Sequence, residues 1–462
     1  MQYVSTRGQT PPLGFQDAVM TGLARDGGLL LPADIPRLSD RLPAWQRLSY
    51  ADLAFEIMRL YADLPGRHLR EIVDRSYGTF RHPDITPVVC ADGIHVVELF
   101  HGPTLAFKDI ALQFLGNVFE YVLEQSDREL NILAATSGDT GSAAICGVRG
   151  REHIRIFVMH PHGRVSPTQE RQMTTVLDGN VFNVAVKGTF DDCQRIMKDL
   201  FNDLAFKDRY ALGTVNSINW ARVLAQIVYY FFAAFRVMRL TGADRVQVAV
   251  PTGNFGDIFA GYVACQMGLP ISRLVLATNE NDILARFFNT GDYNRGPVQA
   301  TISPSMDIQA ASNFERYLYY RVGADPVALR DQMRQFAATG RLNLAPHANG
   351  AIDDIIVAGS AATADTKATI REFWTRHHYL LDPHTAVGVH VARRHLRPDE
   401  PMLCLATAHP AKFGQAIRDA VGHDLAHHPI LDELMDLPTR CAVLPPSAAA
   451  VRAHLEQIIP RP

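Results

Sequence analysis

The sequence has few cysteines and a net charge close to zero, and each of these features excludes a class of protein. Its six cysteines include no CxxC pair, so neither a zinc ribbon nor a disulfide framework is expected. A net charge of −3 over 462 residues gives no general field that would attract nucleic acid or an anionic membrane. Any anion that the protein binds must therefore be held by local geometry, at loops and helix ends.

Three further features are missing. The one candidate membrane span, the uncharged run 223–235 between Arg222 and Arg236, is too short to cross a bilayer and predicts a buried helix. The amino terminus lacks the basic-then-apolar order of a signal peptide. The eighteen histidines include no HExxH pair, so no metal site is expected. These absences predict a cytoplasmic protein that binds neither a membrane nor a metal.

The composition and patterning that are present predict a globular α/β protein. Apolar residues make up 47% and charged residues 20%, so a packed core is expected throughout. Residues 1–90 predict a separate, mostly helical unit, with amphipathic stretches at 15–24, 51–63 and 67–78. Two β-rich runs then meet at Asp92-Gly93, which predicts a hairpin.

Between residues 91 and 410, strand-like apolar runs alternate with longer helical patterns, which predicts parallel sheets. Residues 411–462 predict a carboxy-terminal helical extension. The clearest strand-like runs are Leu130–Ala135, Ile154–Met159, Val246–Val250, Leu274–Ala277 and Met402–Ala406.

Two of these runs end in glycine-rich turns that open a helix. Val246–Val250 is followed by PTGNFGD, and Leu130–Ala135 by TSGDTGS. Unsatisfied backbone N–H groups gather at such a helix start, which suits a phosphate or a carboxylate. The alternative is a tight turn or a well-capped helix without a ligand. If the first turn holds a phosphate, the Asp257 side chain must point away from it.

Lys108, in HGPTLAFKD, stands at the start of a predicted helix. The helix dipole at that end and apolar neighbours such as Phe107 both disfavour the ammonium form, which is how a nucleophilic amine is made. The alternative is a surface lysine beside Asp109. Two polar segments complete the set: NSINWAR, with Arg222 one turn into an apolar helix, and TAHPAKF after the strand 402–406.

Together and in this order, these segments resemble the threonine synthases. The motifs that carry the resemblance are HGPTLAFKD, ATSGDTGSAA, NSINWAR, PTGNFGD, SPSMDI with SNFERY, and TAHPAKF, with YVSTRG and DGGLLLP near the amino terminus. Other enzymes of the same fold that use pyridoxal 5′-phosphate (PLP) would share only the lysine and the glycine turn. The resemblance implies fold type II: two three-layer α/β subdomains with parallel sheets, and a mostly helical amino-terminal domain.

The resemblance also implies a role for each motif residue. Lys108 would form a Schiff base with PLP, and Thr407 would hydrogen-bond the pyridine nitrogen. The PLP phosphate would be held by Gly253, Asn254, Phe255 and Gly256. The candidates for substrate binding are Thr104, Ser137, Gly138, Asp139, Thr140, Asn219 and Arg222, of which the last two would hold the substrate phosphate.

The implied reaction converts O-phospho-L-homoserine and water to L-threonine and phosphate. One alternative is a threonine-synthase-like phospholyase, which would release 2-oxobutyrate and ammonia together with phosphate. Another is a catalytically silent protein that binds PLP or senses an amino acid, against which the intact Lys108 argues. The sequence leaves open whether the chain is a monomer or a homodimer.

Overall fold

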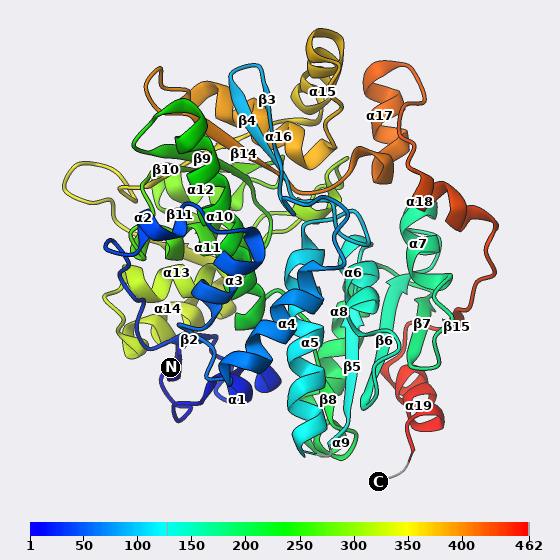
Figure 1. Ribbon diagram of the computed structural model, residues 1–462. Coiled ribbons are helices and arrows are strands. Elements are labelled where there is room, and N and C mark those ends of the chain that lie inside the picture. Colours follow the sequence, from blue (N-terminus) through cyan, green and yellow to red (C-terminus); the bar gives the residue numbers. More distant parts are fainter. Residues whose placement is uncertain (127, 461–462) are drawn as a thin grey trace.

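The computed structural model describes residues 1–126 and 128–460. It contains two large sheets with helices on both faces, and an amino-terminal unit that packs across one side of them (Figure 1). The first sheet has six strands in the order β13-β10-β9-β14-β4-β3, and the second has five in the order β15-β7-β6-β5-β8. The expected α/β architecture with two sheets is confirmed.

The six-stranded sheet is parallel except at one edge. Its strands are β13 (Ile356–Ser360), β10 (Ile271–Thr278), β9 (Val246–Pro251), β14 (Met402–Ala406), β4 (Ile94–Glu98) and β3 (Val88–Ala91). Strand β3 pairs with β4 antiparallel through a turn in which Asp92 and Gly93 have φ values of 55° and 71°. Two successive left-handed residues are typical of a two-residue hairpin turn. The predicted hairpin is therefore confirmed.

The five-stranded sheet is parallel throughout. Its strands are β15 (Ala442–Leu444), β7 (Val181–Val186), β6 (Ile154–Pro161), β5 (Leu130–Ala135) and β8 (Leu212–Gly213). The edge strand β15 comes from the carboxy-terminal segment, which was expected to be only helical. The helices of that segment are α17 (Gly414–Val421), α18 (Pro429–Asp432) and α19 (Ala448–Ile458).

One hydrophobic core joins the inner faces of the two sheets. Val248 of β9 and Ile132 of β5 belong to the same buried cluster, together with four helices. These are α5 (Lys108–Ser126), α6 (Asp139–Val148), α10 (Trp220–Thr241) and α11 (Gly256–Gln266). Among the described residues, only α10 is long and apolar enough to span a membrane, but 72% of its most apolar stretch is buried in the protein. The predicted buried helix is thus confirmed.

Other helices cover the outer faces. Helices α15 (Thr363–His377) and α16 (Pro383–Ala392) pack on the six-stranded sheet, and α8 (Phe190–Asn202), α9 (Leu204–Arg209) and α19 pack on the five-stranded sheet. The remaining elements are α7 (Pro167–Thr174), α12 (Ile283–Thr290), α13 (Phe314–Arg321), α14 (Pro326–Thr339) and a small ribbon of β11 (Asp292–Asn294) and β12 (Arg341–Asn343).

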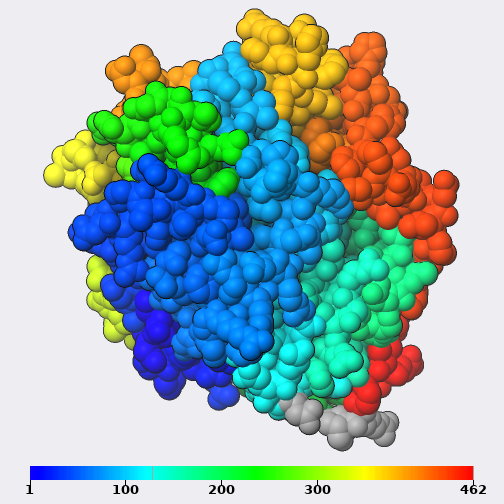
Figure 2. Space-filling view, in the orientation of Figure 1, coloured from blue at the N-terminus to red at the C-terminus, as the bar shows by residue number. Residues whose placement is uncertain are grey.

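The amino-terminal unit contains the expected helices and a strand pair that was not expected. Its elements are β1 (Tyr3–Ser5), α1 (Phe15–Thr21), β2 (Leu30–Pro32), α2 (Leu42–Trp45), α3 (Tyr50–Met58) and α4 (Gly66–Tyr77). Aromatic contacts fix it to α10, with ring centroids 6.2 Å apart for Trp45 and Phe231 and 5.3 Å apart for Tyr50 and Phe232. Figure 2 shows no break between this unit and its neighbours. The domain limits near residues 90 and 410 stay predictions.

Candidate active site

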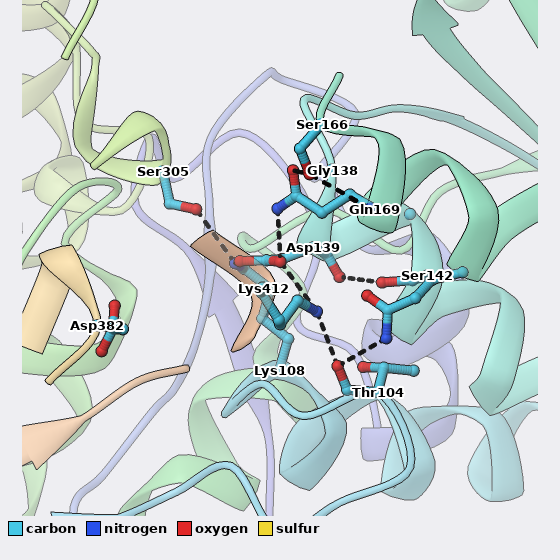
Figure 3. A network of polar contacts seen from close by, with 12 residues as sticks. Thr104, Lys108, Gly138, Asp139, Ser142, Ser166, Gln169, Ser305, Asp382 and Lys412 are labelled. Atoms are coloured by element: carbon cyan, nitrogen blue, oxygen red, sulfur yellow. Dashed lines mark hydrogen bonds and ion pairs between the residues drawn. The ribbon is translucent and has the colours of Figure 1, made fainter. Parts of the chain in front are cut away.

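Lys108 is the first residue of α5, and its side chain is buried. The residue is 8% exposed, and its amine lies 3.3 Å from a carboxylate oxygen of Asp139 and 3.4 Å from the Ser305 hydroxyl (Figure 3). Burial lowers the pKa of Lys108, and nearby Lys412 acts in the same direction, whereas Asp139 opposes the shift. The lysine is therefore not a surface residue, and its carboxylate neighbour is Asp139 rather than Asp109.

The loop before Lys108 is fixed at both of its ends. The Thr104 amide and hydroxyl donate to the Asp109 carboxylate at 2.8 and 2.6 Å, which closes the turn. The Phe107 amide donates to the Thr407 carbonyl at 2.9 Å, just beyond the end of β14. Lys108 and Thr407 are therefore neighbours, as the predicted roles require.

The glycine turn after β9 has donors available for an anion. Within the described chain, none of the backbone N–H groups of residues 253–256 donates to a protein acceptor. Phe255 has a φ of 64°, and α11 begins at the next residue. A Cβ on Gly253 would lie 2.5 Å from the Ser305 carbonyl oxygen, so Ser305 packs against this turn as well as against Lys108. The amine and the turn, which were predicted to hold one cofactor, thus lie on either side of Ser305.

Asp257 points away from this turn. Its carboxylate accepts hydrogen bonds from the hydroxyls of Tyr229 at 2.5 Å and Tyr230 at 2.9 Å, both on the buried helix α10. Burial raises the pKa of Asp257 to about 6, although the two hydroxyls oppose the shift. The condition set by the sequence, that this carboxylate leaves the turn free for an anion, is therefore met.

The second turn opens α6. Gly138 has a φ of 146°, and a Cβ there would lie 2.5 Å from the Gln169 side chain, so the position requires glycine. In the described residues, the N–H groups of Asp139 and Thr140 have no protein acceptor. Ser137 and Thr140 are half-buried. Amide and hydroxyl donors at a helix start suit a carboxylate ligand.

The Asp139 side chain does not take part in that donor set. Its carboxylate lies between the buried side-chain nitrogens of two lysines, Lys108 at 3.3 Å and Lys412 at 3.0 Å (Figure 3). Burial would raise the pKa of Asp139, but the two lysines, together with a hydrogen bond from Gln169, hold it well below its usual value. No local pattern singles out Lys412, because nothing in TAHPAKF shows that this lysine is buried.

Ser305 is also a residue to which the sequence assigned no role. Its backbone N–H donates to His384 Nε2 at 3.2 Å, and the other ring nitrogen of His384 lies 2.9 Å from Asp382. Both His384 and Asp382 are buried, at the start of α16. This chain of contacts fixes the segment that separates Lys108 from the glycine turn.

The two candidates for the substrate phosphate have different environments. Asn219 caps α10: its oxygen accepts from the Ala221 amide at 3.1 Å, and its nitrogen donates to the Val19 carbonyl at 2.8 Å. Arg222 is buried, donates to the Val215 carbonyl at 3.0 Å, and has an Nε with no acceptor in the described structure. Both roles stay predictions, and Arg222 has the freer donor.

The amino-terminal unit contacts the loops of the site directly. Arg316 on α13 is fully buried, and its guanidinium donates to the Leu30 carbonyl at 2.9 Å and to the Ile218 carbonyl at 2.5 Å. It also donates at 2.5 Å to Asn313, whose side chain donates in turn to the Asn254 carbonyl at 3.1 Å. Strand β2 is thereby linked to both the loop before α10 and the glycine turn.

A cavity of about 510 Å³ is bordered by His409 and Pro410 of the segment after β14. Its walls include Glu98, His101, Tyr379, His409 and His428. Neither Lys108 nor the glycine turn lines it. The site is therefore defined by the contacts around Ser305 and Asp139, and not by this cavity.

Three protein-family models match the chain. They are described as threonine synthase N terminus over residues 2–77, pyridoxal-phosphate dependent enzyme over 81–353, and threonine synthase, C-terminal, over 385–455.

Curated relatives and solved structures agree with these matches. A threonine synthase of Pseudomonas aeruginosa is 45% identical, covering 99% of this chain and 98% of its own. The threonine synthase-like 2 protein of Xenopus laevis is 39% identical over 90% of each chain. A crystal structure of PLP-bound threonine synthase from Brucella melitensis is 45% identical, with a TM-score of 0.95 over 99% of both chains.

We predict that Gly253→Ala weakens PLP binding. The new Cβ would lie 2.5 Å from the Ser305 carbonyl, so the turn must shift. Overpacking of this kind costs about 1–3 kcal/mol, so the dissociation constant should rise by about 5- to 150-fold. It can be measured by absorbance titration of the PLP-free chain. Gly179→Ala is the control, because a Cβ there meets nothing within 4 Å. Equal affinities in the two variants would contradict the assignment.

Proposed function

The chain belongs to the threonine synthase family of PLP-dependent lyases, and we propose how its residues support the conversion of O-phospho-L-homoserine and water to L-threonine and phosphate. One observation carries the proposal: the buried Lys108 amine and the glycine turn at 253–256 both lie against Ser305. A single small molecule with an aldehyde and a phosphate can therefore reach both.

The residues around Ser305 fit PLP. The Lys108 amine would bind its aldehyde, the free N–H groups of residues 253–256 would hold its phosphate, and the Thr407 hydroxyl would face its pyridine nitrogen. When bound, PLP withdraws electrons from the bonds that break at the α- and β-carbons of the substrate. A hydroxyl partner leaves the pyridine nitrogen largely unprotonated, unlike an aspartate partner.

The start of α6 would hold the substrate carboxylate. The N–H groups of Asp139 and Thr140 have no acceptor in the described residues, and the Ser137 and Thr140 hydroxyls lie beside them in sequence. The helix dipole favours a negative charge at this position. Thr104 is a weaker candidate, because its hydroxyl donates to Asp109 and its carbonyl accepts from Lys412.

Arg222 would bind the phosphate that leaves the substrate. Burial lowers the pKa of Arg222 only to about 10, so the guanidinium stays charged at neutral pH. Within the described chain, no carboxylate lies within 4 Å of it. A buried guanidinium without an acidic partner is suited to a phosphate, which it can contact with two donors.

Lys108 would move the protons of the reaction. Burial favours its neutral amine, which has the lone pair needed to accept a proton from the α-carbon. Once the ammonium has given that proton up, the neutral amine can accept a second one from the β-carbon. The Asp139 carboxylate at 3.3 Å would stabilise the ammonium that forms. Each role is thus filled by a group whose charge and burial suit it.

The enzyme is expected to act on this small molecule in the cytoplasm, as a monomer or a homodimer, without nucleic acid or membrane. The net charge of −3 and the buried α10 support that expectation.

The products distinguish this function from that of a phospholyase. Incubation with O-phospho-L-homoserine should release threonine and phosphate in equal amounts, measured by amino-acid analysis and a phosphate assay. Phosphate that is accompanied by 2-oxobutyrate and ammonia, with no threonine, would identify a phospholyase instead.

Replacing Lys108 with alanine should remove both cofactor attachment and turnover. Without the amine, added PLP forms no Schiff base with the chain, so borohydride reduction leaves no covalent PLP adduct by mass spectrometry, and kcat falls by about 10³-fold or more. Lys187→Ala serves as the control, because Lys187 is exposed. Normal turnover in the Lys108 variant would be incompatible with the role given to this amine.

Arg222→Met should weaken recognition of the substrate phosphate. Loss of a buried charged donor to a ligand lowers kcat/KM by about a hundredfold or more, and inhibition by inorganic phosphate should be lost. The melting temperature should not fall, since an unpaired buried charge is removed. Arg239→Met is the matched control, an exposed arginine on the same helix. Unchanged phosphate inhibition in Arg222→Met would refute this assignment.

A further inference from the structure

Two buried lysines share one buried carboxylate at this site. Asp139 Oδ2 lies 3.3 Å from Lys108 Nζ, and Asp139 Oδ1 lies 3.0 Å from Lys412 Nζ. The side chains of Asp139 and Lys412 are 3% and 0% exposed. Water therefore cannot screen these charges, and their interactions are strong.

Lys412 is held rigidly in a 3₁₀ turn, Pro410–Phe413, that follows β14. Besides the ion pair, its amine donates to the Thr104 carbonyl at 2.7 Å. The same oxygen of Asp139 that contacts Lys412 also accepts from Gln169 Nε2 at 2.8 Å. One carboxylate oxygen is thus fully engaged, which leaves the other directed at Lys108 (Figure 3).

Charge balance shows why the second lysine is needed. A buried carboxylate without a cation is costly. Lys108 cannot supply that cation permanently, because its proposed role requires an uncharged amine. Lys412 has no such role, so Lys412 and Asp139 together are neutral while Lys108 is uncharged. When Lys108 accepts a proton, the new ammonium group lies beside a carboxylate that is already ionised.

We propose that Lys412 is a positioning residue for the reaction. It keeps Asp139 ionised and oriented, so that the carboxylate forms an ion pair with the Lys108 ammonium when Lys108 accepts a proton. The proposal rests on the function given above. In the step concerned, the C–H bond at the substrate α-carbon breaks and its proton bonds to the lone pair of Lys108 Nζ. The electron pair of that bond stays on the substrate and is withdrawn by PLP. The proton leaves Nζ for the substrate in a later step.

A purely structural role for Lys412 predicts a different outcome. If it only held the turn through Thr104, its loss would lower stability or kcat without changing the proton affinity of the Lys108 nitrogen. The other titratable groups near the trio are Arg222 of α10, Asp109 of α5 and His384 of α16. These three groups are unchanged in every variant described below, so a shift in a pH midpoint is due to the substituted residue.

The test compares Lys412→Met, Asp139→Asn and Lys412→Arg in the holoenzyme. Two readouts are measured: the acid limb of kcat/KM against pH, and the pH midpoint of the PLP absorbance band. Loss of the Lys412 cation should raise both by about one pH unit, and loss of the Asp139 anion should lower them. Lys412→Arg keeps the charge and should lie close to the wild type.

Opposite shifts in the first two variants are the decisive result. Unchanged midpoints in Lys412→Met, or shifts of the same sign in both variants, would overturn the proposal. Melting temperatures show whether each variant folds; if Lys412→Met does not, Asp139→Asn and Lys412→Arg still decide. A wild type that makes no threonine would refute the proposed function, while the absorbance titration would still test the trio.

Discussion

The interaction on which the site depends is the Asp139 carboxylate between Lys108 and Lys412. It joins three segments that are distant in sequence: the start of α5, the start of α6 and the turn after β14. Strand β5, which leads into α6, belongs to one sheet, and β14 belongs to the other. The ion trio therefore fixes the two sheets relative to each other at the point where chemistry takes place. Its burial makes it strong, and the same burial keeps the amine of Lys108 reactive.

Asp139 contacts the Lys108 amine on one side, and Ser305 contacts it on another. Ser305 separates the amine from the glycine turn, and the buried His384 holds its backbone. The amino-terminal unit supports the same region, because Arg316 links β2 to the loop before α10 and, through Asn313, to Asn254. The unit that the sequence marks as separate is thus tied by hydrogen bonds to the loops that form the site.

The predictions that succeeded rest on local patterns. Strands β5 and β14 have the predicted limits, because each is a short apolar run bounded by polar residues and a turn. The burial of Lys108 followed from its apolar neighbours, and the orientation of Asp257 followed from the need to leave the turn free. The unpredicted features are set by tertiary packing. Whether Lys412 is buried depends on Asp139, 273 positions earlier, and no local pattern reports such a pairing. Strand β15 has three residues, too few to show a period.

The position of β15 affects how the protein can be made. The five-stranded sheet begins with β5, yet its edge beside β7 closes only when Ala442–Leu444 arrives, after every strand of the other sheet. Strand β7 is therefore synthesised long before β15, and its outer edge stays unpaired until residues 442–444 emerge.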